Sequence, residues 1–445
     1  MRTPTTARRI RTPAGSAMMV VALLGVSSCA TLRATVSAYE TGPNGISRPQ
    51  HRLREALVHA DFTTAFGWSE DDALLRALNL GVSSYYASQF ARSAAVLDSA
   101  ALLADDRITI SLSKNALALV TNDMARDYSP RRTERLFIPY YSMLAFSRLE
   151  QWDDAAIEAR RLTALLELYA ADRSESERAT HATLHSLAGA VFERAGERDE
   201  AQVAYRNARA LLPTPDDSAV GARAKGDGEV LVVVERGFVA HRATESINIF
   251  FHDEDRDSVH GGPRHGRGHE YARREDHDDD DDDGYWLSVA LPSVRRSHRL
   301  AGEPAIVVDG AHAVTSRRSM LLDDAVTADE QRERASFLTR ATARAAAKYV
   351  ITKAVQDKKG EVAGSIANIG ASLMERADIR SWHLLPQEIT LLRVRMAAGQ
   401  HSLAIAVGEA GGRVDVGAVS VRAGLTTIAA VRLWNEPAPP LIAVK

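Results

Sequence analysis

Apolar and polar residues between positions 49 and 213 alternate with a helical period, and the region is rich in Ala and Leu. Within it, the spacing of residues 185–213 resembles the tetratricopeptide repeat (TPR), a helix–turn–helix unit of about 34 residues. The matching residues are Gly189, Phe192, Gly196, Ala201, Tyr205, Ala208 and Pro213. The pattern therefore predicts a TPR-like helical repeat domain over residues 49–213.

The residue types of this match have physical reasons. Gly189 and Ala201 are small where the two helices of one unit are expected to cross closely, and Phe192 and Tyr205 are expected to fill the space between them. Gly196 falls at the turn, where the backbone needs conformational freedom. A proline directly after the second helix ends it, because proline cannot donate to the next helical turn.

Two weaker copies of the unit precede this match. The first carries Gly81, Leu97 and Ala100, and the second carries Phe146, Trp152 and Ala155. Three units are about the smallest number that buries a continuous solenoid core. The concave face of such a solenoid would bind a peptide or protein segment, whereas a plain helical bundle with the same periodicity would offer no groove.

The pattern changes after residue 213. Residues 214–228 are rich in Pro, Gly and Asp and predict a linker. Apolar or alternating runs then predict short strands at 230–234, 247–251, 287–291, 392–396, 403–407, 414–421 and 425–433. This spacing, with glycines in the turns, predicts a sandwich-like β-rich domain over residues 229–445. We therefore expect an α+β fold, with TPR-like helical repeats first and a β-rich domain with inserted helices second.

Residues 327–376 interrupt the predicted strands with a helical pattern. Arg340, Arg344 and Lys348 lie four residues apart, so they form a basic stripe on one face of this helix. The stripe is either a solvated edge paired with nearby acids or a docking site for an acidic partner or lipid headgroups.

Residues 252–284 are of low complexity. Histidines alternate there with Gly, Arg and Asp, and residues 278–283 are all Asp. Such a run of like charges repels itself and does not pack, so we expect a disordered insert between two strands. Imidazole and carboxylate groups also bind metals, which leaves a metal-responsive loop open, although no spacing here fixes a coordination geometry.

The N-terminus has the features of a lipoprotein signal peptide, residues 1–28. Arginines precede a short apolar stretch that is too short to span a bilayer, and small residues come after it. Val26, Ser27 and Ser28 before Cys29 resemble a lipobox, whose cysteine receives a diacylglyceryl group and whose new amine can receive a further acyl chain. The alternative is an ordinary secretory signal with a chance cysteine near the cleavage site.

The residues after Cys29 bear on localisation. Residues 29–48 contain Gly and Pro and predict a flexible tether. Ala30, rather than Asp, stands next to Cys29, which by the sorting rule of enteric bacteria predicts the outer membrane, facing the periplasm. We therefore expect the membrane to be a partner through the lipid on Cys29.

Composition narrows the function classes. A formal net charge of −3 gives no general attraction to nucleic acid, and the single cysteine excludes an internal disulfide framework. His269 and Glu270 begin a zinc-protease motif, but Arg273 stands where its second histidine would be. We therefore predict no catalytic residue, no metal ligand and no cofactor.

Three sets of residues together carry a family resemblance. They are Asn122-Asp123, Tyr128, Pro130 and Glu134 before Tyr140-Tyr141; Trp152-Asp153-Asp154-Ala155 leading into Glu158-Ala159-Arg160-Arg161; and Arg380-Ser381-Trp382, Leu385-Pro386 and the stretch 398–403. As a set they resemble a poorly characterised family of bacterial envelope lipoproteins with TPR-like helical repeats and a β-rich C-terminal domain. The resemblance implies this domain order and brings no established reaction. The long His/Asp insert departs from the family.

The leading hypothesis is a non-catalytic, membrane-anchored adaptor that binds an envelope protein through its repeats. Asn122, Asp123 and Tyr128 fall where helices break, so they either cap helix ends or form a polar floor to the repeat groove, and Glu134 is a further candidate for this groove. A second hypothesis is a cell-envelope assembly factor whose β domain contacts peptidoglycan or another glycan. The third is the metal-responsive module, and the oligomeric state stays open.

Overall fold

The computed structural model describes residues 46–113, 127–213, 225–252, 284–313, 315–359, 378–408 and 412–434. Side chains are described in these ranges except at 109–113, 246–252, 284–290 and 341–359. The signal peptide, Cys29 with its lipobox, Asn122, Asp123 and nearly all of the acidic insert lie outside the described residues. Residues 56–445 form one compact unit, separate from residues 1–55.

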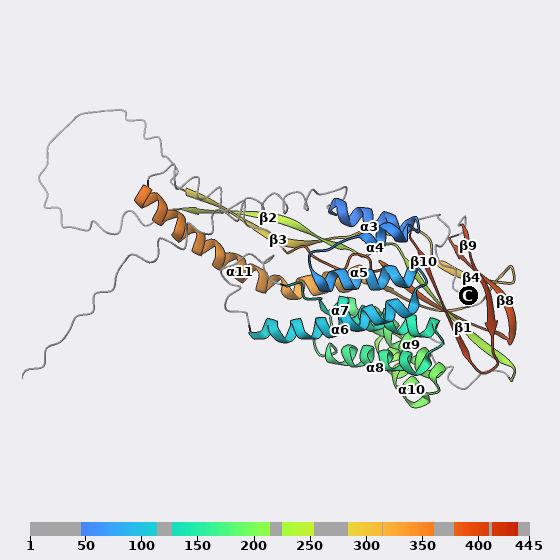
Figure 1. Cartoon of the computed structure of the whole chain (residues 1–445). Helices are drawn as coiled ribbons and strands as arrows, with labels where there is room; N and C mark the ends of the chain where they lie inside the picture. Colours follow the sequence, from blue (N-terminus) through green and yellow to red (C-terminus); the bar gives the residue numbers. More distant parts are fainter. Residues whose placement is uncertain are drawn as a thin grey trace, which may run out of the picture. The chain divides into compact units, whose positions relative to one another are not determined.

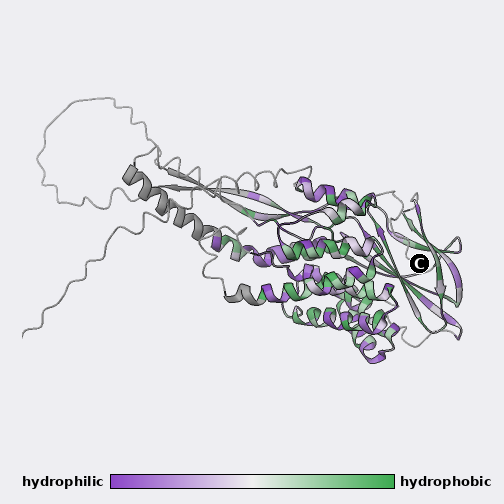
Figure 2. Ribbon diagram, viewed as in Figure 1, coloured by the Kyte–Doolittle hydropathy of each residue, from purple (hydrophilic) through white to green (hydrophobic). Residues whose placement is uncertain are grey.

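The first half of the described chain is helical, as its periodicity predicts. The helices are α3 (Arg48–Val58), α4 (Phe62–Gly67), α5 (Ala73–Tyr86), α6 (Phe90–Ser113), α7 (Arg132–Arg148), α8 (Trp152–Leu168), the short 3₁₀ helix η4 (Glu175–Glu177), α9 (Arg178–Ala195) and α10 (Arg198–Leu211). Helices α5 to α10 form three hairpins, α5/α6, α7/α8 and α9/α10, which pack in succession (Figure 1). Green and purple stretches alternate along these helices in Figure 2, as expected for amphipathic elements.

Two of the hairpins close around a glycine. A Cβ atom added to Gly81 would lie 2.6 Å from the Leu97 side chain, and one added to Gly189 would lie 2.7 Å from the Tyr205 ring. Gly196 ends α9 with a φ of 87°, in the left-handed region that favours glycine. The second helices of the hairpins begin at intervals longer than a TPR unit, so the assignment to TPR stays a prediction.

The second half forms the predicted β-rich region, which confirms the α+β fold class. Its strands are β1 (Asp227–Arg236), β2 (His241–His252), β3 (Gly284–Arg295), β4 (Pro304–Val308), β5 (Ala311–His312), β6 (Ser316–Leu321), β7 (Glu388–Ala397), β8 (Gly399–Val407), β9 (Arg413–Val421) and β10 (Thr426–Leu433). They form sheets of order β10-β1-β7-β6 and β5-β4-β8-β9, and the hairpin β2-β3. In the first sheet β1 pairs with β10 in parallel and with β7 antiparallel.

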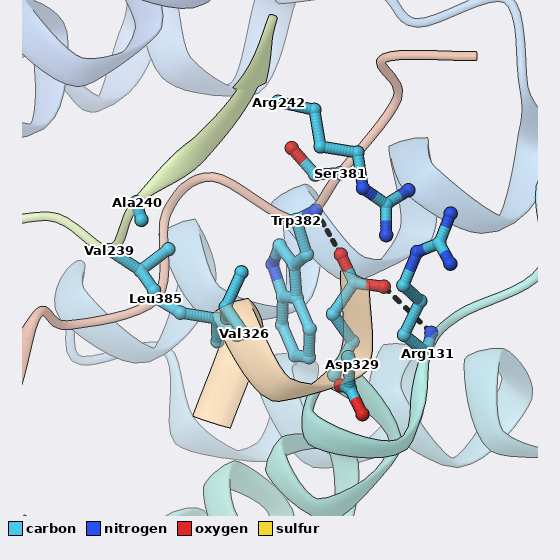
Figure 3. A pocket seen from close by; sticks show the side chains of 10 residues that line it. Arg131, Val239, Ala240, Arg242, Val326, Asp329, Ser381, Trp382 and Leu385 are labelled. Carbon is cyan, nitrogen blue, oxygen red and sulfur yellow. Dashed lines mark hydrogen bonds between the residues drawn. The ribbon is translucent and has the colours of Figure 1, made fainter. Parts of the chain in front are cut away.

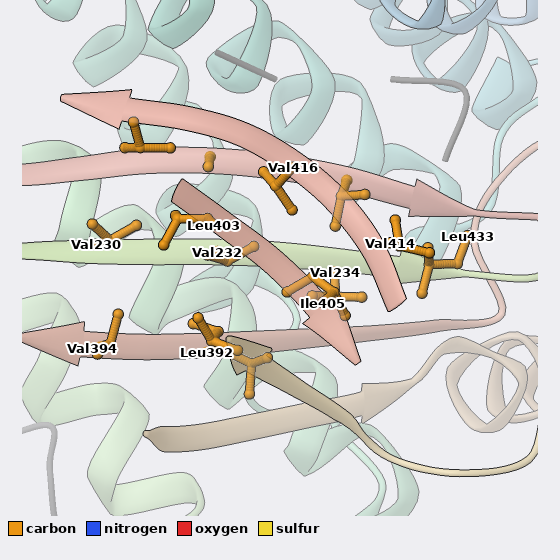
Figure 4. Close-up of a cluster of buried hydrophobic side chains, with 14 of the residues drawn as sticks. Val230, Val232, Val234, Leu392, Val394, Leu403, Ile405, Val414, Val416 and Leu433 are labelled. Atoms are coloured by element: carbon orange, nitrogen blue, oxygen red, sulfur yellow. The ribbon is translucent and has the colours of Figure 1, made fainter. Parts of the chain in front are cut away.

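One apolar core joins the two four-stranded sheets into a sandwich (Figure 4). Its members come from both sheets and include Val230, Val232, Val234, Leu392, Val394, Leu403, Ile405, Val414, Val416 and Leu433. Burial alternates along β9 on either side of a one-residue shift at Gly417 and Ala418, which is the burial pattern of a strand with one face on a core. Buried Val and Ile on pleated strands account for the stability of this half.

The predicted inserted helix is α11 (Leu322–Lys359), which begins directly after β6 and runs beside β3 (Figure 1). It begins earlier than predicted, and residues 360–376 of the prediction lie outside the described residues. Searched over the described residues, no helix is both long and apolar enough to cross a membrane.

Candidate functional site

The first helices of the three hairpins are buried on nearly all sides. Buried residues number 10 of 14 in α5, 13 of 17 in α7 and 13 of 18 in α9. The second helices α8 and α10 have only 6 of 17 and 4 of 14. The difference arises because the β-rich half packs on the first helices, and the contacts between the halves include several buried polar clusters.

The most deeply buried cluster surrounds Glu235 on β1. The Tyr86 hydroxyl donates to its Oε2 at 2.9 Å, and the Tyr140 hydroxyl donates to its Oε1 at 2.9 Å. Tyr141 lies 2.8 Å from the Tyr86 oxygen, and because a hydroxyl has one proton, Tyr141 donates to Tyr86. Burial raises the pKa of Glu235, while Arg432 and these tyrosines oppose the rise. One sheet carboxyl group is thus held by two tyrosines of the helices directly and by a third through Tyr86.

Arg432 on β10 supplies the positive charge of this cluster. Its Nη1 donates to the Tyr86 hydroxyl at 2.9 Å, and its Nη2 donates to the Gly237 and Leu384 carbonyl groups. The guanidinium lies 4.4 Å from the centre of the Trp434 ring. Glu235 and Arg432 are each only 1% exposed, so the cluster is inaccessible to a substrate.

A second junction joins α7 to the segment before β7. The Glu134 side chain accepts from the backbone N–H of Trp382 at 2.7 Å and from that of Arg131 at 2.8 Å (Figure 3). Burial raises the pKa of Glu134 to about 8, against the effect of these hydrogen bonds. The protonated form is therefore favoured at neutral pH.

A small pocket lies beside Glu134. Figure 3 shows it between Trp382, Arg242 and Asp329, with Leu385 and Val239 on its apolar side. The free space has room for no more than about one water molecule. The pocket is therefore too small for a substrate.

The last hairpin is joined to β6 and β7 by arginines. Arg393 donates to the Tyr205 hydroxyl at 2.6 Å and to Glu229 at 2.9 Å. Arg318 on β6 donates to the carbonyl groups of Ala208 at 3.4 Å and Leu212 at 2.8 Å, which caps the end of α10. The sheet thus satisfies groups that the helix alone leaves unpaired.

The first turns of α11 complete the junction. Asp329 accepts from the Thr133 backbone N–H at 2.8 Å, at the start of α7. Arg332 pairs with Asp329 at 2.8 Å and with Glu177 of η4. Burial raises the pKa of Asp329, which its bonds to Thr133 and Arg332 oppose.

The predicted groove residues fall inside this junction. Tyr128 and Glu134 are 1% and 5% exposed, so they cannot line an open groove, and this corrects their predicted role in binding a partner. The physical reason is that the chain's own second half occupies the face on which they lie. Glu134 instead acts as a capping residue: it closes a capping box with Arg131.

The predicted basic stripe is described only in part. Arg340 lies over the Phe337 ring at 4.8 Å. Arg344 and Lys348 lie on α11 at positions where side chains are not described. The docking role of the stripe therefore stays a prediction.

The solvent-exposed surface of the second helices carries apolar residues at equivalent positions in each hairpin. The sixth and thirteenth residues of α6, α8 and α10 are all apolar and exposed, and we call these six positions the outer face: Ala95, Leu102, Ile157, Ala164, Val203 and Ala210. Ile157 is 46% exposed, Val203 48% and Leu102 65%. Single exposed apolar residues are ordinary, and here they recur at equivalent positions of successive helices.

Sequence reasoning missed Glu235, Arg432 and Arg393 because their partners lie far along the chain. It also passed over the outer face, for which the apolar residues seven apart in each second helix were a usable signal.

No group of three or more metal-binding side chains occurs among the described residues. No protein-family model, curated protein or solved structure matches the chain.

Proposed function

We propose that the chain is a non-catalytic adaptor of the bacterial cell envelope, anchored in the outer membrane by lipid on Cys29 and bound to an envelope protein through its helical hairpins. The observation that carries the proposal is the outer face. It places apolar side chains such as Ile157 and Val203 in solvent at equivalent positions. Burial of such residues favours association by about 25 cal/mol per Å².

The inner side of the hairpins has a different role in this proposal. The tyrosines and Glu134 that a TPR-type groove would offer to a peptide are engaged by the chain's own sheets. The C-terminal half thereby fixes the helical hairpins against one another. A rigid platform loses less conformational entropy on binding than a flexible one, which suits an adaptor.

The anchor restricts the adaptor to one surface. Two or three acyl chains on Cys29 would give stable attachment, because each buried CH₂ contributes about 0.8 kcal/mol. Attachment raises the effective concentration of the outer face near other envelope proteins. Weak single contacts then suffice for a lasting complex.

The test combines lipid labelling with partner capture in living cells. Cells producing wild-type chain or Cys29→Ala are fed an alkyne fatty acid, cross-linked and fractionated, and the chain is purified for mass spectrometry. We expect label, outer-membrane fractionation and one defined envelope protein with wild type, and loss of all three with Cys29→Ala.

An unlabelled wild-type chain in the soluble fraction would remove the anchor from the proposal. A capture pattern that is the same for Ile157→Ser/Val203→Ser as for wild type would remove the outer face from it. The glycan and metal hypotheses stay predictions from the sequence, since no described contact favours either.

A further inference from the structure

One histidine side chain joins two turns at a corner of the sandwich. β7 of the first sheet ends at Ala397, and β8 of the second sheet begins at Gly399. His401, the third residue of β8, reaches from this corner to the turn between β4 and β5. Its Nε2 lies 2.9 Å from the Ala397 carbonyl oxygen, and its Nδ1 lies 2.8 Å from Oδ2 of Asp309.

Asp309 fastens the β4–β5 turn to β8. Asp309 and Gly310 form a two-residue turn in which both have positive φ, 48° and 90°. Asp-Gly is a favoured sequence for such a turn. The Asp309 backbone N–H donates to the Ser402 carbonyl group at 2.9 Å, and its Oδ1 accepts from the Ser402 N–H at 2.8 Å. β4 and β8 are neighbours in the same sheet (Figure 1), so these contacts extend their pairing into the turn.

The two nitrogens of the His401 ring both face oxygen atoms. A neutral imidazole carries one N–H, so it donates to one of these oxygens and turns a lone pair toward the other. Only the imidazolium donates to both. In agreement with this geometry, the hydrogen bond with Asp309 raises the pKa of His401 above 6.5 and lowers that of Asp309 below 3.8.

Asp309 is the charged group that His401 faces. β9 places Val419 opposite it, and β7 contributes the Ala397 carbonyl group. His312 of β5 lies on the other side of β4 from β8. Among the described residues, no charge besides Asp309 alters the pKa of His401. The His401 side chain is 18% exposed, so it exchanges protons with solvent, and its own titration controls the contact.

We propose that His401 is a pH-sensitive clamp, which holds the β4–β5 turn on β8 while its imidazole is protonated and releases β5 from the sheet as the pH rises. β5 is short enough for this contact to matter. It has two residues, both exposed, which pair with Val307 and Val308 of β4. The inference goes beyond the adaptor function and does not depend on it.

Release of β5 uncovers the outer edge of β4. In the closed form the Ile306 carbonyl group accepts from the Ala313 N–H at 3.0 Å, beyond the end of β5. Without β5 these backbone groups face solvent, and an uncovered strand edge pairs readily with another strand. The contribution of the clamp to closure is complete below pH 6.5, the unfolded value, and is lost as the pH rises through the higher folded pKa.

Hydrogen exchange followed by mass spectrometry tests the clamp on the purified full-length chain. Peptides covering residues 304–313 report the turn, and peptides from β1 report any opening of the whole sandwich. After correction for the intrinsic rate of exchange, we expect protection of the turn to fall by about three- to fivefold from pH 5.5 to pH 8.5, the range expected for one solvent-accessible ion pair. Protection of β1 should fall by clearly less.

Variants assign the effect to the two side chains. In His401→Gln, protection of the turn at pH 5.5 should already equal the wild-type value at pH 8.5. Asp309→Asn keeps a favoured turn sequence and the acceptor for Ser402 but removes the charge, so the change should move to lower pH. His312→Gln, at the exposed histidine of β5 itself, is the matched control and should keep the wild-type dependence.

A second measurement follows the proton directly. In chain with ¹³C-labelled histidine, the magnetic resonance signal that is absent from His401→Gln should titrate above pH 6.5, and at lower pH in Asp309→Asn. A His401 midpoint at or below 6.5 would overturn the proposal, as would the same pH dependence of turn protection in wild type and His401→Gln. If His401→Gln fails to fold, which loss of β1 protection would reveal, wild type and Asp309→Asn still decide.

Discussion

The carboxyl group of Glu134 is the clearest single example of a residue whose environment sets its chemistry. It lies in the junction with two backbone donors, Trp382 and Arg131, and burial raises its pKa to about 8. In the unfolded chain the pKa is near 4.5. At a pH between these two values, Glu134 therefore takes up a proton when the chain folds. The contribution of Glu134 to the free energy of unfolding is present in full below pH 4.5 and is lost as the pH rises through about 8.

Glu134→Gln should remove this dependence while keeping an amide oxygen as acceptor. We expect the variant's free energy of unfolding, relative to wild type, to rise by on the order of 1 kcal/mol per pH unit between about pH 5 and 8, and then to level off. Urea unfolding monitored by circular dichroism measures it. Glu167→Gln, at an exposed residue, is the control, and pH profiles parallel to wild type for both variants would contradict the assignment.

The contact of Gly189 with Tyr205 gives a second prediction at this scale. A Cβ at position 189 would lie 2.7 Å from a ring whose hydroxyl is already bonded to Arg393 and Glu193, so the ring cannot easily move. We expect Gly189→Ala to lower stability by about 1–3 kcal/mol. Gly67→Ala, with nothing within 4 Å of its Cβ, should change it by less than about 0.5 kcal/mol.

Equal losses of stability from the two glycine variants in urea unfolding would show that the close crossing of α9 and α10 is not the cause of the loss.

The crossing itself was predictable, because Gly189 and Tyr205 stand where the repeat pattern needs a small and a large residue. The partners of Glu134 were not, because Trp382 lies 248 residues away and no local pattern records such a contact.

At the scale of elements, the Glu235 cluster joins the helical hairpins to the first sheet. Removal of one partner leaves the other charge buried and uncompensated, which costs about 3–5 kcal/mol. We expect Glu235→Gln and Arg432→Met each to destabilise the chain by about this amount, and the double variant by clearly less than the sum. Thermal unfolding of all four forms provides the double-mutant cycle.

Arg413→Met is the matched control, because Arg413 is exposed on β9. It should unfold as wild type does. Additive losses from Glu235→Gln and Arg432→Met would mean that the two residues do not act through one cluster.

The elements that the sequence predicted best are those with a clear period. The strands β1, β7, β8, β9 and β10 alternate or run apolar, and the structure contains each of them. β4, β5 and β6 were not predicted. Arg317 and Arg318 break the apolar pattern of β6, and Arg318 is there because it caps α10. The parallel pairing of β1 with β10 depends on the sandwich as a whole and has no local signal.

At the scale of the whole molecule, buried carboxyl groups and buried histidines change the stability of the chain in opposite directions as the pH changes. Burial raises the pKa of Glu134 to about 8, and that of Glu158 to about 7, so their contribution falls as the pH rises. Burial lowers the pKa of His181 and His185 to about 4 from 6.5, so their contribution is present above pH 6.5 and lost as the pH falls through about 4.

These opposed trends predict a stability maximum on the acid side of neutrality. Thermal midpoints measured from pH 4 to pH 9 check it. His181→Phe/His185→Phe should flatten the acid side and leave the alkaline side unchanged. A maximum at pH 8 or above would contradict the burial of these carboxyl groups.

The molecule as a whole presents two different surfaces of its hairpins. The first helices are covered by the chain's own sheets, and the second helices carry the outer face to solvent. The sequence predicted the hairpins, the sandwich and their order. It placed Tyr128 and Glu134 on an open groove, whereas both are buried, because no local pattern records that the C-terminal half packs against the first helices.

Site-specific photo-cross-linking in living cells, with a photoreactive amino acid at position 157, 203 or, as the control, at the exposed Leu338 of α11, is the sharpest test of an anchored adaptor that binds through its outer face. We predict one discrete adduct with the same envelope protein from positions 157 and 203, its loss in Cys29→Ala, and no adduct from position 338. An adduct from position 338 alone, or none from the outer face while the chain is folded and anchored, would contradict the adaptor proposal.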